Sequence, residues 1–206
     1  MEEAVIVVGL VAEATAWWFV AFRGRDVWRV MTPVLAAMGV AAISAGPPAW
    51  SPEVEPAVAV GAGFGAGVAL YAATRAFVLV ARPWRVFRRH AVGLYRRQGE
   101  LSLAGALVLS VALTVPGEEV FWRGFVQPEL AKTMDAWVAA LLGWAAFVAA
   151  NAPSRNLAVL ASAVVGGAVW GALGWWSGGA LAPLVCHAAW TALMLSFPVV
   201  RRSVVA

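Results

Sequence analysis

The chain has 206 residues, of which 62% are hydrophobic and 13% are charged, and its formal net charge is +4. A soluble domain has a much smaller hydrophobic fraction, so this composition excludes an ordinary soluble protein and indicates a polytopic membrane protein. The single cysteine, Cys186, excludes an internal disulfide and a multi-cysteine metal site. No basic segment precedes the first apolar run, which we therefore expect to be a retained span rather than a signal peptide.

Seven apolar segments are long enough, alone or with their flanks, to cross a hydrocarbon core of ~30 Å. They cover residues 4–22, 30–46, 57–81, 101–125, 135–152, 157–176 and 181–199. We therefore expect an all-α bundle that forms one membrane-embedded domain over residues 1–206. Its parts are three spans in 1–81, a basic loop at 82–100 and a four-span core at 101–199. Spans four to seven are expected to enclose a polar cavity.

The loops between these segments differ in charge. Twelve of the fifteen basic residues fall in loops that the order of spans places on one side of the membrane. They are Arg23, Arg25, Arg29, Arg82, Arg85, Arg88, Arg89, Arg96, Arg97, Arg155, Arg201 and Arg202; the exceptions are Arg75, Arg123 and Lys132. The positive-inside rule then puts the N-terminus outside and the C-terminus in the cytoplasm. The abundance of arginine, alanine and valine is typical of GC-rich bacteria, so we expect a bacterial cytoplasmic (inner) membrane.

The most basic stretch, residues 82–97, mixes arginines with apolar residues. This pattern predicts a cytoplasmic loop or surface helix that contacts anionic lipid headgroups. The sequence pI near 10.2 would also suit nucleic acid, but the arginines lie beside membrane spans, so no nucleic-acid partner is expected. We expect His90, within this stretch, to be a solvated residue at the membrane interface.

Two adjacent carboxylates and an arginine interrupt the fourth apolar segment, at Glu118, Glu119 and Arg123. In a helix, Glu119 and Arg123 are one turn apart on one face and can pair, whereas Glu118 lies about 100° around the axis. This spacing suggests one neutralised carboxylate and one that is free for chemistry. A buried structural ion network of all three is the alternative, because charged residues inside spans usually point into the protein.

Two expectations concern the surroundings of this stretch. Pro116 precedes the carboxylates, and we expect the fourth span to kink or break there, which would place Glu118 and Glu119 near the positive end of a restarted helix. Glu13 in the first span and Arg75 in the third are expected to be structural, either as an ion pair or with Arg75 extending to the cytoplasmic face.

Later spans carry further polar residues. Asn151 ends the fifth apolar segment, and a polar residue at a helix end is by itself more often a cap or hydrogen-bond anchor than a catalytic residue. In the seventh segment His187 and Thr191 are one turn apart on the same helical face. A buried histidine in a span needs a partner and can take up a proton. Glu118 and His187 can meet at one water only if spans four and seven are neighbours.

Taken together, these residues resemble the three motifs of the CAAX-protease and bacteriocin-processing (CPBP, or Abi) family of intramembrane glutamic endopeptidases. The matching stretches are Glu118-Glu119-x-x-x-Arg123, Phe147-x-x-x-Asn151 and His187-x-x-x-Thr191. The Pro-x-Glu-Glu, Arg-Gly and Gly-x-Leu-Ala-Pro-x-x-x-His contexts, the last from Gly179 to His187, also agree. The resemblance covers about residues 100–195, and spans one to three match only in being apolar.

The resemblance implies roles for the motif residues. Glu118 would activate the attacking water, and Glu119 with Arg123 would hold the site together. The second motif of the family ends in a histidine that helps to bind this water, where the present chain has Asn151. The third motif pairs a histidine with an asparagine to stabilise the oxyanion, and Thr191 replaces that asparagine beside His187. Asn151 can still hydrogen-bond a water, and Thr191 can still donate one hydrogen bond.

We therefore expect an intramembrane endopeptidase that cleaves membrane-anchored proteins or peptides without a metal or another cofactor. Because Glu118 is expected toward the outer end of span four, the site would face the extracytoplasmic half of the membrane, and cytosolic prenylated substrates are disfavoured. The sequence does not give the oligomeric state.

Three alternatives remain open. A non-catalytic relative, acting as a membrane scaffold or as an immunity protein against a peptide toxin, is favoured by the changes at Asn151 and Thr191. A metal-dependent protease would use Glu118, Glu119 and His187 as ligands, but no HExxH motif is present. A small transporter is disfavoured because no inverted repeat is visible.

Overall fold

The computed structural model describes residues 2–81, 83–96 and 101–199, and within these ranges every regular element is helical. The α-helices are α1 (Glu2–Phe22), α2 (Val27–Ala45), α3 (Pro56–Ala81), α4 (Arg85–Arg96), α5 (Leu103–Leu109), α6 (Val115–Phe121), α7 (Gln127–Ala131), α8 (Ala136–Asn151), α9 (Leu157–Ala161), α10 (Gly167–Ser177) and α11 (Leu181–Ser196). Three π-helical turns, η1 (Ser110–Thr114), η2 (Trp122–Val126) and η4 (Ser162–Gly166), and a 3₁₀ turn, η3 (Ala152–Ser154), join some of them into longer helices.

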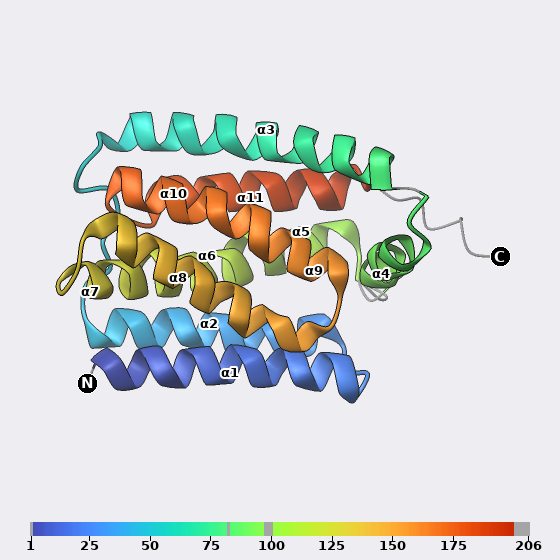
Figure 1. Cartoon of the computed structure of the whole chain (residues 1–206), viewed down its shortest axis with the longest axis horizontal. Coiled ribbons are helices and arrows are strands. Elements are labelled where there is room, and N and C mark those ends of the chain that lie inside the picture. The colour runs from blue at the N-terminus through green and yellow to red at the C-terminus, as the bar shows by residue number, and fades with distance from the viewer. Residues whose placement is uncertain (1, 82, 97–100, 200–206) are drawn as a thin grey trace.

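Six of these helical stretches are long and apolar enough to cross a membrane. They are Glu2–Phe22, Val27–Ala45, Pro56–Ala81, Leu103–Ala131, Ala136–Ser154 and Leu157–Ser177, and the shorter apolar helix α11 follows them. Figure 1 shows these helices lying alongside one another, roughly parallel to the long axis of the molecule. The prediction of a polytopic all-α bundle is thereby confirmed.

The fourth span is continuous, so of the kink or break expected at Pro116 the break does not occur. Helical structure runs through Leu103–Ala131, with the π turns η1 and η2 on either side of α6. A proline cannot donate a backbone hydrogen bond, and here a wider turn immediately before α6 accommodates it without ending the helix. Glu118 and Glu119 therefore lie inside a span, close to its middle, and not at a free helix N-terminus.

Glycines allow the third and seventh spans to pack closely. The helices α3 and α11 lie side by side. A Cβ atom added at Gly63 would collide with the carbonyl oxygen of Ala182, and one at Gly67 would lie 2.6 Å from the carbonyl oxygen of Cys186. Small residues at such crossings let two backbones approach each other in a membrane. This contact fixes α11, the helix that carries His187.

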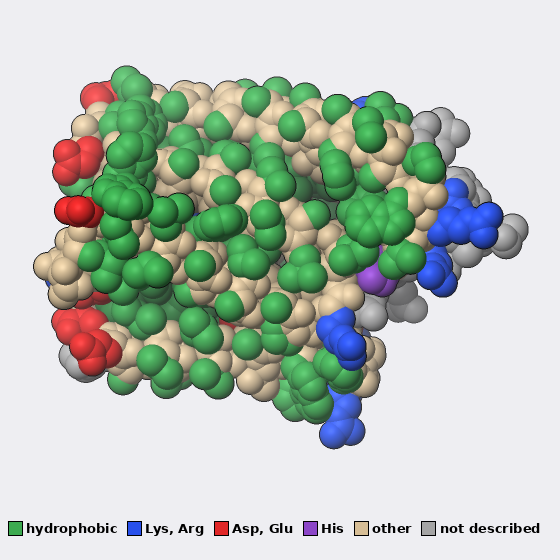
Figure 2. Space-filling model, in the orientation of Figure 1, with side chains coloured by type: hydrophobic (Ala, Val, Ile, Leu, Met, Phe, Trp, Pro, Cys, Tyr) green, Lys and Arg blue, Asp and Glu red, His purple; other side chains and the backbone are tan. Residues whose placement is uncertain are grey.

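Charge is segregated along the bundle. Figure 2 shows basic side chains gathered at one end of the molecule and acidic side chains at the other. The short helix α4 lies at the basic end (Figure 1) and buries Phe87, Ala91 and Val92 while Arg85 and Arg88 stay exposed. The predicted stretch 82–97 is thus a surface helix over Arg85–Arg96, and residues 82 and 97 lie outside the described residues.

His90 is half-buried and connects α4 to the sixth span, a contact that the expectation of a solvated interfacial histidine did not include. Its Nδ1 accepts a hydrogen bond from the backbone N–H of Leu157 at 3.0 Å, and Asn156 donates to the His90 carbonyl at 3.3 Å. The first N–H groups of a helix have no partner within that helix. His90 supplies an acceptor for one of them at the start of α9.

Candidate active site

A single carboxylate oxygen, Oε1 of Glu119, is at the centre of the polar site. Arg123 Nη1 lies 3.2 Å from it and His187 Nδ1 lies 2.8 Å from it. Glu119 and Arg123 are almost completely buried, with 0% and 2% of their surface exposed. The pairing expected from their one-turn spacing in span four is therefore confirmed, and His187 from span seven joins it.

Arg123 has further contacts that hold it in place. Its Nη2 donates to the carbonyl oxygen of Gly167 at 3.3 Å. Its guanidinium carbon lies 4.7 Å from the ring centre of Phe147 and 5.7 Å from that of Trp170, distances typical of cation–π contacts. Side chains and a backbone carbonyl of spans five and six therefore hold the Arg123 guanidinium in position. These contacts fix the guanidinium beside the Glu119 carboxylate.

Glu118 is in a different environment from its neighbour. Its Oε2 lies 4.0 Å from His187 Nδ1, and none of the described residues donates a hydrogen bond to its carboxylate. Glu118 is nevertheless only 7% exposed. The two adjacent carboxylates are thus divided as their spacing suggested: Glu119 is neutralised by Arg123 and Glu118 has its hydrogen-bonding capacity free.

The geometry around His187 indicates which ring nitrogen carries a proton. Because Glu119 is paired with an arginine, its oxygen is an acceptor, so the 2.8 Å contact requires a proton on His187 Nδ1. The imidazole is stacked on Trp170, with the ring centres 3.7 Å apart and an angle of 16° between the planes. Glu119 and Trp170 together fix the ring orientation, and Nε2 is left as the nitrogen that can contact a ligand.

Glu118, His187 and Thr191 line one cavity of about 180 Å³. The other lining residues are Trp17, Val27, Trp28, Met31, Thr32, Leu35, Ser110, Thr114 and Val115. Spans one, two, four and seven therefore form its walls, whereas the sequence predicted that spans four to seven would enclose the polar cavity. The difference arises because α2 packs directly against α6, while α8 and α10 lie behind the Glu119–Arg123 pair.

The direction in which this cavity extends also differs from the prediction. Val27 and Trp28 begin α2, next to the exposed Arg25 and Arg29 at the basic end of the bundle. The expectation that Glu118 lies toward the outer end of its span is wrong, because helical structure continues to Ala131. The cavity runs from the middle of span four toward the basic end.

Asn151 is not brought into this cavity. Its Nδ2 donates to Glu13 Oε1 at 2.8 Å and to the carbonyl oxygen of Phe147 at 3.0 Å, so both of its amide hydrogens are used. The other oxygen of Glu13 accepts from Trp122 Nε1 at 2.9 Å. Glu13 is completely buried. This carboxylate in the first span is a part of the polar core whose partners the sequence analysis missed.

Of the two arrangements expected for Glu13 and Arg75, an ion pair or an Arg75 that extends away from the bundle, the ion pair does not occur. Arg75 is exposed, and its Nη1 lies 3.2 Å from the hydroxyl of Tyr71, on the same helix. Glu13 instead finds two N–H donors inside the bundle. The only signal in the sequence was the presence of a charged residue in the middle of an apolar span, which shows that a partner is needed but does not say which.

The residues at the site do not form a recognisable metal centre. Among the described residues, no three His, Cys, Asp or Glu side chains are grouped so that they could hold a metal ion. His187 contributes Nδ1 to Glu119, and Arg123 occupies the other side of the same oxygen. A cation at this oxygen would compete with a guanidinium that is already in place.

The fold and this site define a class of protein: a polytopic helical membrane protein with a glutamate, a histidine and a glutamate–arginine pair buried in its interior. Residues 100–193 match the model of a family described as type II CAAX prenyl endopeptidase Rce1-like. This match covers the part of the chain that carries the three motifs, and it confirms their resemblance to the CAAX protease family. Comparison with curated proteins and with solved structures found no match.

Proposed function

We propose that the chain is an intramembrane endopeptidase, which hydrolyses peptide bonds of membrane-anchored proteins or peptides with a water activated by Glu118. The observation that carries this proposal is the position of His187 Nδ1, 2.8 Å from Glu119 and 4.0 Å from Glu118. Arg123 neutralises Glu119, and Glu118 faces the cavity with its hydrogen-bonding capacity free. Ionisable groups inside a span are costly, and they commonly mark function.

Glu118 acts as general base and then as general acid. It accepts a proton from a water whose oxygen attacks the scissile carbonyl carbon, so a carbon–oxygen bond forms and the carbonyl oxygen becomes an oxyanion. Glu118 then gives the proton to the amide nitrogen while the carbon–nitrogen bond breaks. A carboxylic acid and an amine leave, and the Glu118 carboxylate is restored.

His187 and Thr191 stabilise the oxyanion. They lie one helical turn apart on α11 and both line the cavity that contains Glu118. When protonated, His187 Nε2 is a donor, and the Thr191 hydroxyl can donate one hydrogen bond. Donors that are already in place where charge develops cost no reorganisation in the transition state. Glu119 supports this role by holding Nδ1 of the same imidazole.

Two tryptophans from the first spans provide donors for the peptide backbone. The indole nitrogens of Trp17 and Trp28 are buried and have no acceptor among the described residues, and both side chains line the cavity. A peptide that enters a membrane interior brings carbonyl oxygens that need hydrogen-bond donors. We assign Trp17 and Trp28 to this role.

The segregation of charge supports an orientation. With the N-terminus outside and the C-terminus in the cytoplasm of a bacterial cell, the exposed arginines before α2 and on α4 face the cytoplasm. The arginines of α4 would also contact anionic headgroups there. Because the cavity extends toward this end, the substrate enters from the cytoplasmic half of the membrane. This replaces the expected extracytoplasmic site and makes cytosolic, lipid-anchored tails suitable substrates.

The test compares membranes from cells that produce the wild type, Glu118→Gln or Glu129→Gln, with protein termini identified by mass spectrometry. Glu129 is a matched control in the same span, where it pairs with Lys132 away from the cavity. We expect a set of cleaved termini that is present with the wild type and Glu129→Gln and absent with Glu118→Gln. If termini were identical in all three, endopeptidase activity through Glu118 would be ruled out.

One observation favours a second candidate, a non-catalytic membrane scaffold or immunity protein. Both amide hydrogens of Asn151 are used inside the bundle, so the second motif offers the cavity no donor. For a non-catalytic protein, cells with Glu118→Gln would keep the phenotype of the wild type. The set of protein termini found in the membranes would then be the same with and without the chain.

A further inference from the structure

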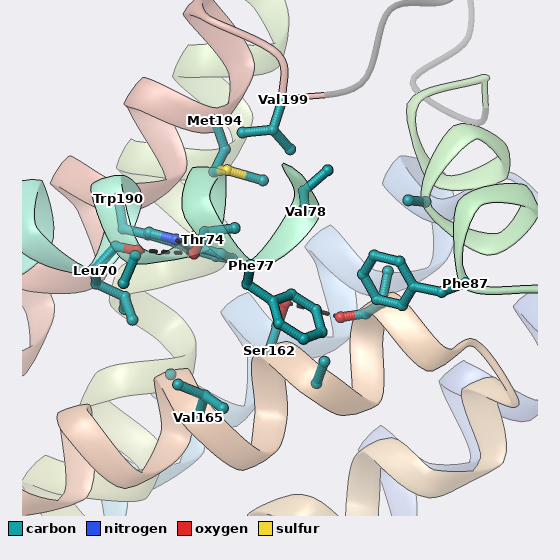
Figure 3. Close-up of a pocket in the computed structure, with 15 residues that line it drawn as sticks. Leu70, Thr74, Phe77, Val78, Phe87, Ser162, Val165, Trp190, Met194 and Val199 are labelled. Atoms are coloured by element: carbon teal, nitrogen blue, oxygen red, sulfur yellow. Dashed lines mark hydrogen bonds between the residues drawn. The ribbon is translucent and has the colours of Figure 1, made fainter. Parts of the chain in front are cut away.

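A second cavity lies outside the candidate active site, at the basic end of the bundle. It measures about 290 Å³ and lies between α3, α4, the α9–η4 segment and α11. The lining side chains labelled in Figure 3 come from these elements and from the segment after α11. Phe77, Phe87 and Trp190 supply aromatic walls, and most of the remaining lining is aliphatic.

The few polar groups in this wall are already satisfied. Thr74 Oγ1 donates to the carbonyl of Leu70 at 2.8 Å and accepts from Trp190 Nε1 at 3.1 Å. Ser162 Oγ donates to the carbonyl of Ala158 at 2.9 Å, as Figure 3 shows. The cavity therefore presents an apolar surface, which suits a hydrocarbon chain and not a polar ligand.

The helix that closes this cavity also carries positive charge. On α4, Phe87 and Ala91 line the cavity, while the neighbouring Arg85, Arg88 and Arg89 are exposed. No carboxylate among the described residues pairs with these three arginines. An apolar slot bordered by unpaired arginines matches a molecule with an anionic head and a hydrocarbon tail.

We propose that this cavity binds an anionic glycerophospholipid, with one acyl chain between α3, α4, the α9–η4 segment and α11 and with the phosphate on the arginines of α4. Lipid tails are as apolar as the protein surface, so the tail by itself gives little preference over bulk lipid. The headgroup charge supplies the selectivity. Each arginine near an anionic headgroup increases affinity about fivefold.

The position of Trp190 links this lipid to the candidate active site. Trp190 lines the lipid cavity, and its ring centre lies 5.7 Å from that of Trp170, which is stacked on His187. An acyl chain in the cavity would therefore restrain Trp190 and, through one ring, the imidazole. This consequence rests on the proposed function, whereas lipid binding does not.

The test measures lipid retention by native mass spectrometry of the whole chain, in detergent with added phosphatidylglycerol or phosphatidylcholine. Arg85→Gln/Arg88→Gln removes charge beside the cavity, and the control Arg25→Gln removes an exposed arginine from another loop at the same end. We expect phosphatidylglycerol to be retained preferentially. The double variant should lose more than tenfold in affinity, and Arg25→Gln should bind as the wild type does.

A second pair of variants tests the acyl-chain slot. Ala161→Phe places a ring in the proposed cavity, and Ala172→Phe places one in another apolar cavity of about 270 Å³, whose lining includes Trp137 and Trp175. Only Ala161→Phe should reduce retention of phosphatidylglycerol. A brominated acyl chain should quench the part of the fluorescence that is lost in Trp190→Phe.

Several outcomes would overturn the proposal. Equal retention of phosphatidylglycerol and phosphatidylcholine would mean that the chain has no site for an anionic lipid. A loss of affinity in Arg25→Gln as large as that in Arg85→Gln/Arg88→Gln would mean that the basic end of the bundle attracts lipid without a specific site. Displacement of bound phosphatidylglycerol by a prenylated peptide would assign the cavity to the tail of a substrate. None of these results depends on whether the chain cleaves peptides, so failure of lipid binding and failure of proteolysis can be told apart.

Discussion

Glu13 Oε1 lies 2.8 Å from Asn151 Nδ2, and this hydrogen bond joins the first span to the end of the fifth. Trp122 in the fourth span donates to the other oxygen of Glu13 at 2.9 Å. One fully buried carboxylate thus connects three spans. It also accounts for the amide of Asn151, which the resemblance of the motifs alone would have directed at a water in the site.

This network predicts the effect of Glu13→Gln. A glutamine amide has one acceptor oxygen, so its NH₂ group must face either Trp122 Nε1 or Asn151 Nδ2, and one buried donor loses its partner. We expect the free energy of unfolding to fall by about 1–3 kcal/mol. Thermal unfolding in detergent measures it, with Glu3→Gln as an exposed control on the same helix. An unchanged midpoint in Glu13→Gln would contradict the network.

Removing Arg123 should be more damaging than removing both members of its pair. Arg123→Gln leaves Glu119 buried beside His187 without its cation, which costs about 3–5 kcal/mol. Glu119→Gln/Arg123→Gln removes the unpaired charge and should recover part of the loss. A double-mutant cycle on unfolding midpoints measures the coupling, and exposed Arg75→Gln serves as control. Additive effects of the two substitutions would show that the pair has no energetic coupling.

The crossing of the second and fourth spans depends on a glycine. A Cβ atom at Gly117 would collide with the carbonyl oxygen of Leu35. A Cβ atom at Gly39, on the facing helix, would lie only 2.7 Å from the Cα atom of Gly117. Gly117→Ala should therefore push α2 away from the wall of the Glu118 cavity and lower both stability and cleavage.

Gly65→Ala is the matched control for this crossing. Nothing lies within 4 Å of an added Cβ at Gly65. Because alanine favours a helix over glycine by about 0.5–1 kcal/mol, Gly65→Ala should be neutral or stabilising. If both variants behaved alike in thermal unfolding, close approach at Gly117 would not matter.

Thr191 should contribute to turnover through its hydroxyl. Thr191→Val keeps the shape of the side chain and removes its donor, so kcat should fall about 10²-fold, while Thr191→Ser keeps the donor and most of the rate. The measurement is the cleavage rate of a substrate found by terminus mapping. Thr133→Val, outside the spans, controls for the substitution itself. Equal rates for Thr191→Val and the wild type would exclude Thr191 from the oxyanion site.

The proposed orientation can be tested with introduced cysteines. The native Cys186 is completely buried and should give little background labelling. In intact cells a membrane-impermeant maleimide should label Lys132→Cys and should reach Arg25→Cys only after lysis, because the basic end faces the cytoplasm. The opposite pattern would reverse the orientation and would return the cavity to the outer half of the membrane.

The sequence by itself determined the class of the protein and indicated the polar residues of its candidate site, although the structure places Asn151 outside the cavity. Seven apolar segments, with charge that alternates between the loops joining them, are sufficient to predict a helical bundle, because a membrane allows few other structures. The one-turn spacings of Glu119 with Arg123 and of His187 with Thr191 predict shared faces, since these contacts lie within single helices. The order of the motifs was sufficient to indicate the resemblance that the family model then matched over residues 100–193.

Only the tertiary structure decided how these helices meet. It placed His187 against Glu119, gave Glu13 its partners in Trp122 and Asn151, and built the cavity walls from spans one and two. Helical periodicity shows which face of a span carries polar or small side chains, but it does not show which other span packs against that face. The direction of the cavity likewise depends on where α2 crosses α6, and that crossing is set by backbone contact at Gly117.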